Sequence, residues 1–295
     1  MVLENEKDIL KRVRRIEIKS RGLSNEIFAG QYHSAFRGRG MSFSEVREYR
    51  MGDDVRDIDW NVTARSNKPH IKIYEEEREL TLMLVVDISG SVFFGTTSQT
   101  KKGLATEIAA VLAFSAIQTG DKVGCVLFSD RVEKFIPPKK GRAHVLMIIR
   151  EILTFEPQGR GTSLAEPLRY LTNVLPKRST AFVLSDFLYP ASDQQPLSDA
   201  LKIATGKHDI VAVRVSDRRE EELPDVGIAE FEDAESGRKV WVDTSSRTVR
   251  REYQVSRLDR VAAIEATLRH YKIDIASAHT SEDYVRELVK LFKKR

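Results

Sequence analysis

Apolar and polar positions follow a regular rhythm from residue 81 to the end of the chain. Short continuous apolar runs, typical of strands buried on both faces, alternate with stretches whose apolar side chains recur at helical spacing. We predict strands at 81–87, 122–128, 132–136, 180–184, 210–215 and 273–276. Helices are predicted at 101–119, 143–155, 164–175, 197–204, 248–271 and 283–292. This alternation predicts an α/β fold, a doubly wound and mostly parallel sheet flanked by helices.

Two parts of the chain depart from that rhythm and predict an additional small β segment. Residues 22–79 mix glycine, aromatic and charged positions with short alternating stretches, and residues 227–243 read as an antiparallel hairpin. An amphipathic helix is predicted at 4–19. We therefore divide the chain into residues 1–79, the helix with the β segment, and residues 80–295, the α/β domain with a hairpin insertion near 226–243. Both β parts lie outside the alternation, so we expect them to pair as one layer.

Composition narrows the class of protein. The chain has 295 residues, 41% of them hydrophobic, and a formal net charge of only +4, so it is expected to be globular and not to bind nucleic acid. Its single cysteine, Cys125, lies in an apolar run and offers no disulfide or thiolate metal site. No apolar run approaches the roughly 20 residues needed to span a bilayer, and the charged N-terminus resembles no signal peptide. We expect a cytoplasmic protein without membrane insertion.

Oxygen-bearing side chains follow two of the predicted strands. Strand 81–87 ends at Asp87, with Ser89 and Ser91 at alternate positions after it, and strand 180–184 is followed by Asp186. Thr162 ends a loop in which Gly159 and Gly161 are expected to let the backbone approach an ion without a Cβ clash. These segments are all predicted at the carboxyl edge of the sheet, where open α/β sheets bind ligands. Two carboxylates and three hydroxyls suit a hard cation, and they do not suit zinc or copper.

The segment 38–60 is dense in arginine, aspartate and aromatic residues. One interpretation is a charge-paired outer layer whose Tyr49 and Trp60 pack on the sheet. The other is a docking surface for a partner, because arginine and aromatic residues are enriched at interface hot spots. The candidate partner-binding residues are Arg47, Arg50, Asp53, Asp54, Arg56, Asp59 and Trp60.

The acidic and hydroxyl residues also carry a resemblance. Asp87-x-Ser89-x-Ser91, followed by Thr162 and Asp186, resembles the metal-ion-dependent adhesion site of von Willebrand factor A domains at all five positions. Residues 47–60, with Ala64 and Arg65, resemble the hallmark of the DUF58 family, whose members join such a domain to extra N-terminal structure.

The resemblance implies a function in binding. It implies that Asp87, Ser89, Ser91, Thr162 and Asp186 hold one Mg²⁺ per chain, with Mn²⁺ or Ca²⁺ as alternatives. An open position on the ion would accept an acidic side chain of a partner protein. Members of the DUF58 family are commonly associated with MoxR-type AAA+ ATPases, which implies an adaptor or assembly factor. The chain lacks a Gly-x-x-x-x-Gly-Lys-Ser/Thr phosphate loop, so ATP hydrolysis would belong to that partner.

Three other interpretations remain open. Ser89 or Ser91, Asp186 and His279 follow the order of a serine hydrolase triad, although no Gly-x-Ser-x-Gly elbow surrounds either serine. Asp87 is a candidate for a metal-dependent phosphohydrolase, although no general acid or phosphate clamp is evident beside it. Finally, serine, threonine and aspartate favour turns and caps without binding any ion. We favour a binding protein over an enzyme.

Overall fold

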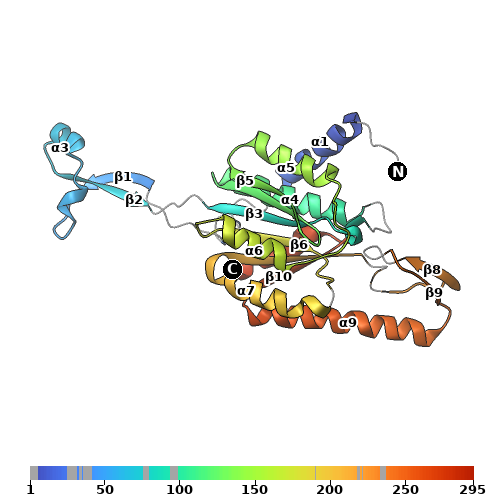
Figure 1. Ribbon diagram of the computed structural model, residues 1–295. Coiled ribbons are helices and arrows are strands. Elements are labelled where there is room, and N and C mark those ends of the chain that lie inside the picture. Colours follow the sequence, from blue (N-terminus) through green and yellow to red (C-terminus); the bar gives the residue numbers. More distant parts are fainter. Residues whose placement is uncertain are drawn as a thin grey trace. The chain divides into compact units, whose positions relative to one another are not determined.

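The computed structural model describes residues 6–24, 32, 35, 42–75, 80–93, 99–189, 191–217, 220, 222–232 and 237–295 (Figure 1). The start of the 38–60 segment and most of the predicted hairpin turn therefore lie outside the described residues. The chain divides into two compact units. The large unit comprises Met1–Ala35 and Thr81–Arg295, and the small unit comprises Phe36–Leu80.

A six-stranded sheet forms the centre of the large unit (Figure 1). Its strands follow the order β10-β7-β6-β3-β4-β5. All neighbouring pairs are parallel except β4 and β5. This confirms the predicted mostly parallel α/β fold. The strands are β3 (Thr81–Asp87), β4 (Lys122–Phe128), β5 (Val132–Lys139), β6 (Thr180–Ser185), β7 (Asp209–Ser216) and β10 (Asp274–His279).

Helices cover both faces of this sheet. Met83 and Val85 of β3 point toward α6 (Ala165–Val174), α7 (Gln194–Lys207) and α9 (Arg247–His270), with which they share one apolar core. Leu84 and Val86 alternate with them and are also fully buried, because the opposite face carries α4 (Lys101–Gln118) and α5 (Arg142–Thr154). The closing helix, α10 (Tyr284–Lys294), packs beside β10. Short 3-10 turns occupy Gly90–Phe93 and Ala191–Asp193.

The N-terminal helix α1 (Glu6–Leu23) belongs to the large unit. It packs against α4 and α5, and ion pairs join Lys19 to Glu107 and Arg142 to Glu17, each at 2.5 Å. The predicted division at residue 80 places this helix with the β segment. Its amphipathic pattern predicts a buried face but does not indicate which elements that face contacts.

The small unit contains β1 (Ser42–Glu48) and β2 (His70–Glu75), which pair antiparallel. Between them lie a 3-10 turn, η2 (Val55–Asp57), and a short helix, α3 (Trp60–Ser66). The predicted hairpin forms as β8 (Ile228–Glu232) and β9 (Lys239–Asp243). Strands β1–β2 and β8–β9 make two separate sheets, so the expectation of one shared layer is wrong. In the described ranges, no helix combines the length and apolar character needed to cross a bilayer.

Candidate functional site

Strand β3 lies between β4 and β6, so its carboxyl end is the point at which the strand order reverses. Asp87, the last residue of β3, is buried there and accepts two hydrogen bonds. The backbone amide of Ser89 donates to its Oδ1 at 2.9 Å, and Ser185 Oγ donates to its Oδ2 at 2.6 Å. Burial and the negative charge of Asp186 raise the pKa of Asp87 to about 7, against the lowering effect of these serine donors.

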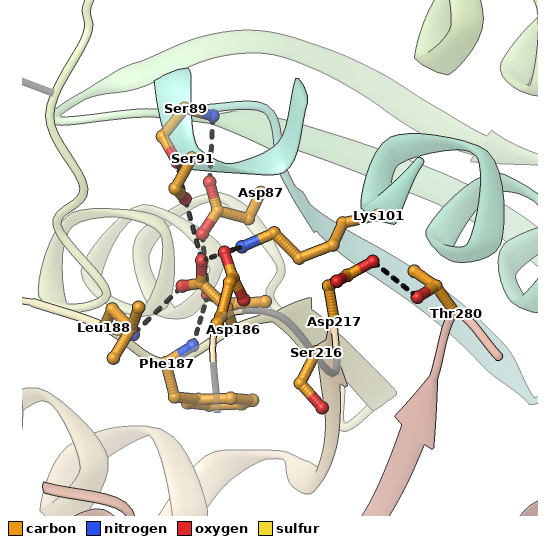
Figure 2. Close-up of polar contacts among 12 residues, drawn as sticks. Asp87, Ser89, Ser91, Lys101, Asp186, Phe187, Leu188, Ser216, Asp217 and Thr280 are labelled. Carbon is orange, nitrogen blue, oxygen red and sulfur yellow. Dashed lines mark hydrogen bonds and ion pairs between the residues drawn. The ribbon is translucent and has the colours of Figure 1, made fainter. Parts of the chain in front are cut away.

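The two serines after β3 connect Asp87 with the acid that follows β6 (Figure 2). Ser89 Oγ and Ser91 Oγ lie 3.2 Å apart, and Ser91 Oγ donates to Asp186 Oδ2 at 2.8 Å. Asp186 Oδ1 accepts the backbone amide of Leu188 at 3.0 Å. Four of the five predicted ligands, Asp87, Ser89, Ser91 and Asp186, are therefore brought into one hydrogen-bonded cluster.

The backbone after Asp186 adopts an uncommon conformation. Phe187 has a φ of 57°, in the left-handed region that bulky residues rarely occupy. Its amide donates to Ser185 Oγ at 3.0 Å, and its ring is buried in the apolar core beneath α6 and α7. Burial of this ring offsets the strain, which typically costs about 1–3 kcal/mol. The turn keeps both oxygens of Asp186 within reach of donors at the sheet edge.

The loop that carries Thr162 lies beside the β3 turn. The amide of Gly90 donates to the carbonyl of Arg160 at 3.1 Å, and Thr162 itself is buried. The amide of Ser163 donates to the carbonyl of Ser129, which follows β4, at 2.9 Å. These backbone bonds place the fifth predicted ligand in the loop adjoining the other four.

The two glycines of this loop differ in how closely other residues approach them. A Cβ on Gly159 would lie 2.1 Å from Asp130 Oδ1, so the close approach is to the turn after β4. Gly161 has ordinary contact distances, with Asp130 Cβ at 3.6 Å. Glu133 anchors the loop by accepting the Gly159 amide at 2.7 Å and Ser129 Oγ at 2.6 Å. Gly159 therefore packs closely against the turn after β4, and the expected approach of the two glycines to an ion stays a prediction.

A lysine that the sequence pattern does not single out reaches the same cluster. Lys101, the first residue of α4, is fully buried, and its Nζ lies 2.7 Å from Asp186 Oδ2 and 2.5 Å from Glu220 Oε1. Burial acts to lower the pKa of Lys101, but the charges of Asp186 and Glu220 raise it further and keep the ammonium protonated. These partners are 85 and 119 residues away in the sequence, so no local pattern identifies the contact.

Two further polar pairs lie at this sheet edge. Asp217, directly after β7, is buried and accepts a hydrogen bond from Thr280 Oγ1 at 2.7 Å (Figure 2). Ser216 Oγ lies 2.8 Å from His279 Nδ1. His279 therefore contacts Ser216 of the neighbouring strand, whereas Ser91 donates to Asp186. That arrangement does not support the serine hydrolase triad that the sequence leaves open.

The donor chemistry of the cluster fits a hard divalent cation. Asp87, Ser89, Ser91 and Asp186 offer carboxylate and hydroxyl oxygens only, the ligand type that Mg²⁺ prefers. Within the described part of the chain, no three histidine, cysteine, aspartate or glutamate side chains form a metal-binding group, so the hydroxyls are needed to complete a shell. Lys101 already donates to Asp186 Oδ2, so an ion that binds this oxygen competes with the lysine.

The seven candidate partner-binding residues belong to the small unit. The aspartates among them accept hydrogen bonds from residues close to them in the sequence. Arg47 makes a bidentate ion pair with Asp53 at 2.7 and 2.8 Å, which lowers the pKa of the Asp53 carboxyl. Asp53 also accepts the amide of Arg50 at 2.7 Å. Asp54 caps η2 and Asp59 caps α3. Within the small unit, 92% of the Arg56 side chain is exposed and Trp60 is 68% exposed.

The fold and this cluster define the class of protein, an α/β protein with an oxygen-rich cluster at the carboxyl edge of its sheet. The family described as "Protein of unknown function DUF58" matches residues 45–262, and the chain belongs to that family. Uncharacterized proteins of Mycobacterium bovis and Mycobacterium tuberculosis are 31% identical over 287 residues, 96% of this chain and 88% of theirs.

Two solved structures are also similar to the chain. BatB from Bacteroides thetaiotaomicron, a conserved hypothetical protein, has 15% identity and a TM-score of 0.49, over 73% of this chain and 98% of that one. The SpRpn10 VWA domain has 10% identity and a TM-score of 0.41, over 74% of this chain and 96% of that one.

Proposed function

We propose that this protein is a divalent-metal-dependent protein interaction module. Asp87, Ser89, Ser91, Thr162 and Asp186 hold one Mg²⁺, or in its place Mn²⁺ or Ca²⁺, and an acidic side chain of a partner binds at the same place. The observation that carries this proposal is the convergence of two buried aspartates from adjacent strands with a pair of hydroxyls. Ser91 Oγ donates to Asp186 and lies beside Ser89 Oγ. Such oxygen clusters at a strand-order reversal are typical ligand sites.

Each residue has a role that follows from its contacts. Asp87 and Asp186 supply negative charge, and their burial makes a counter-charge favourable. Ser89 and Ser91 supply hydroxyl oxygens, which the short turn after β3 holds in place. Thr162 supplies a hydroxyl from the adjoining loop. When bound, the ion supplies a positive charge that a carboxylate of the partner can coordinate.

Binding is better supported than catalysis by the arrangement of the side chains. The hydroxyl of Ser91 donates to a carboxylate, and His279 contacts Ser216. Lys101 is fully buried and paired with two acids, so it is not placed to clamp an incoming phosphate. Neither the serine hydrolase nor the phosphohydrolase interpretation therefore gains a specific observation.

The proposed partner is a MoxR-type AAA+ ATPase, with this chain acting as an adaptor or assembly factor. Support comes from the family resemblance, together with the absence of a phosphate loop in this sequence. We also propose that the exposed Arg56 and Trp60 of the small unit contribute a second contact. A cytoplasmic location stays a prediction from the sequence.

A binding assay with a purified MoxR-type ATPase tests this proposal. The chain is immobilised, and the ATPase is flowed over it with Mg²⁺ or with excess chelator. We expect binding with Mg²⁺, loss of binding with chelator, and loss in Asp87→Ala and Ser91→Ala. Asp199→Ala is the matched control, because it removes an exposed acid from α7 of the same unit. Binding that is unaffected by both chelator and Asp87→Ala would refute a metal-dependent interface.

A further inference from the structure

Lys101 places a cation inside the proposed metal site. Its side chain is fully buried, and its Nζ donates to Asp186 Oδ2, the same oxygen that accepts Ser91 Oγ (Figure 2). An oxygen with two short donors has little capacity left for a third ligand. The Asp186 carboxylate is thus neutralised by the protein's own ammonium.

A divalent ion at this site would lie close to that ammonium. Two positive charges repel strongly at short range in a buried environment, and a divalent ion doubles the interaction. The ion and the ammonium therefore compete for Asp186. An ion that takes this oxygen must displace Lys101 or bind beside it against repulsion.

Glu220 offers the ammonium a second partner. Its Oε1 lies 2.5 Å from Lys101 Nζ, and its Oε2 lies 3.4 Å from Arg257 Nη2 of α9. Tyr253 of α9 donates to the backbone carbonyl of Glu220 at 2.9 Å. The lysine thus lies between one carboxylate that belongs to the site and another that is fastened to α9.

We propose that Lys101 is an internal competitor of the divalent ion. Its ammonium neutralises Asp186 in the ion-free protein. When the ion binds, the ammonium leaves Asp186 and keeps its contact with Glu220. This lowers the affinity of the site for the ion and links its occupancy to α9. The inference rests on the proposed function, because it assumes that the cluster binds a divalent ion.

Calorimetric titration of MgCl₂ into the full chain tests this inference with variants of opposite expected sign. Lys101→Met and Lys101→Gln remove the competing charge, and we expect both to bind Mg²⁺ about 10-fold more tightly, within the usual range of coupling between sites. Glu220→Gln keeps Lys101 but removes its alternative partner, so we expect weaker binding by about 3-fold or more. A loss of structural integrity would weaken binding in all three variants.

The neighbouring lysine provides the matched control. Lys102 lies on the same turn of α4, but its Nζ donates to the carbonyl of Phe155 at 3.1 Å. We expect Lys102→Met to stay within about 2-fold of wild type, because its charge does not share a ligand with the ion. Equal tightening in Lys102→Met would attribute the effect to general charge and overturn the inference.

The remaining outcomes separate this inference from the proposed function. Mg²⁺ binding by wild type with unchanged affinity in both Lys101 variants overturns the inference and leaves the proposed function standing. Binding by the Lys101 variants alone supports the inference and contradicts metal binding by the wild-type protein. Absence of Mg²⁺ binding in every protein overturns both. If a Lys101 variant is unfolded without Mg²⁺, the inference requires Mg²⁺ to restore its circular dichroism spectrum, and failure to do so contradicts it.

Discussion

The carboxyl edge of the central sheet and residues 47–60 of the small unit are both rich in aspartate paired with cations, yet they differ in burial. At the sheet edge, Asp87, Asp186 and Lys101 are buried, and Lys101 meets Asp186 across 85 residues of sequence. In the small unit, Arg47 pairs with Asp53 only six residues away, and Arg56 is almost fully exposed. The sheet edge therefore concentrates charge in a buried place, whereas the small unit distributes it over local caps and a solvated surface.

This difference has energetic consequences. Breaking a buried ion pair leaves an uncompensated charge, whereas an exposed pair is screened by water and contributes little. Similar residue types in the two regions should therefore respond differently to substitution. Charge density along a sequence is a poor guide to a site unless it coincides with burial.

The largest effect is expected at the buried pair. Asp186→Ala leaves Lys101 with Glu220 alone, and we expect the free energy of unfolding to fall by about 3–5 kcal/mol in metal-free buffer. Chemical denaturation followed by circular dichroism measures this change. Asp53→Ala, its counterpart in the small unit, should produce a smaller change, because the Arg47–Asp53 pair is partly exposed to water, whereas Lys101 and Asp186 are fully buried. Equal effects of the two substitutions would contradict the comparison.

A buried group without a charged partner extends the comparison. His208 is buried, Ser179 Oγ lies 3.0 Å from its Nδ1, and among the described residues its Nε2 has no hydrogen-bond partner. Burial, followed by the charges of Lys207 and Arg178, lowers the pKa of His208 from 6.5 to about 4. The unfolded chain binds this proton at a higher pH than the folded chain does. The contribution of His208 to the free energy of unfolding is therefore complete above pH 6.5 and is lost as the pH falls toward 4.

We expect the fall from pH 7 to pH 5 to lower the free energy of unfolding by about 2 kcal/mol through this histidine. The denaturation midpoints of wild type and His208→Gln are measured at both pH values. The pH-dependent change in wild type minus the change in the variant gives the contribution of His208. A variant with the same pH dependence as wild type would show that His208 does not contribute.

The smallest effect on stability is expected at the exposed surface of the small unit. Arg56→Ala and Trp60→Ala should leave the denaturation midpoint unchanged, because both side chains face solvent. If this surface contacts the partner, the same substitutions should weaken partner binding by about 10-fold or more. Unchanged affinity in both variants would assign these residues no part in docking.

The strands of the central sheet could be predicted closely from the sequence. The limits of β3 and β4 agree with the prediction because strands buried on both faces read as continuous apolar runs. The last strand extends to His279, whereas the predicted strand ends at 276. The prediction ends early because Ser277 and His279 interrupt the apolar run of this edge strand. The prediction for β5 also ended early, where Pro137 and Pro138 look like strand breakers.

The candidate site could be predicted only in part. Asp87, Ser89, Ser91 and Asp186 meet because the ends of neighbouring parallel strands share one edge, which topology alone implies. Lys101 and Glu220 could not be predicted in this way, because neither directly follows a strand: Lys101 begins α4, and Glu220 lies in the segment after β7. Nothing in the local pattern around Lys101 distinguishes it from a solvated lysine at a helix start.

Calorimetric titration of Mg²⁺ into wild type and Asp87→Ala tests the central claim most directly. Asp87→Asn serves beside it, because it keeps nearly the same shape while removing the charge, and circular dichroism checks that each variant is folded. We predict one Mg²⁺ per wild-type chain and no measurable binding heat in either folded variant. Equal heats from wild type and both variants would contradict a metal site at the carboxyl end of β3.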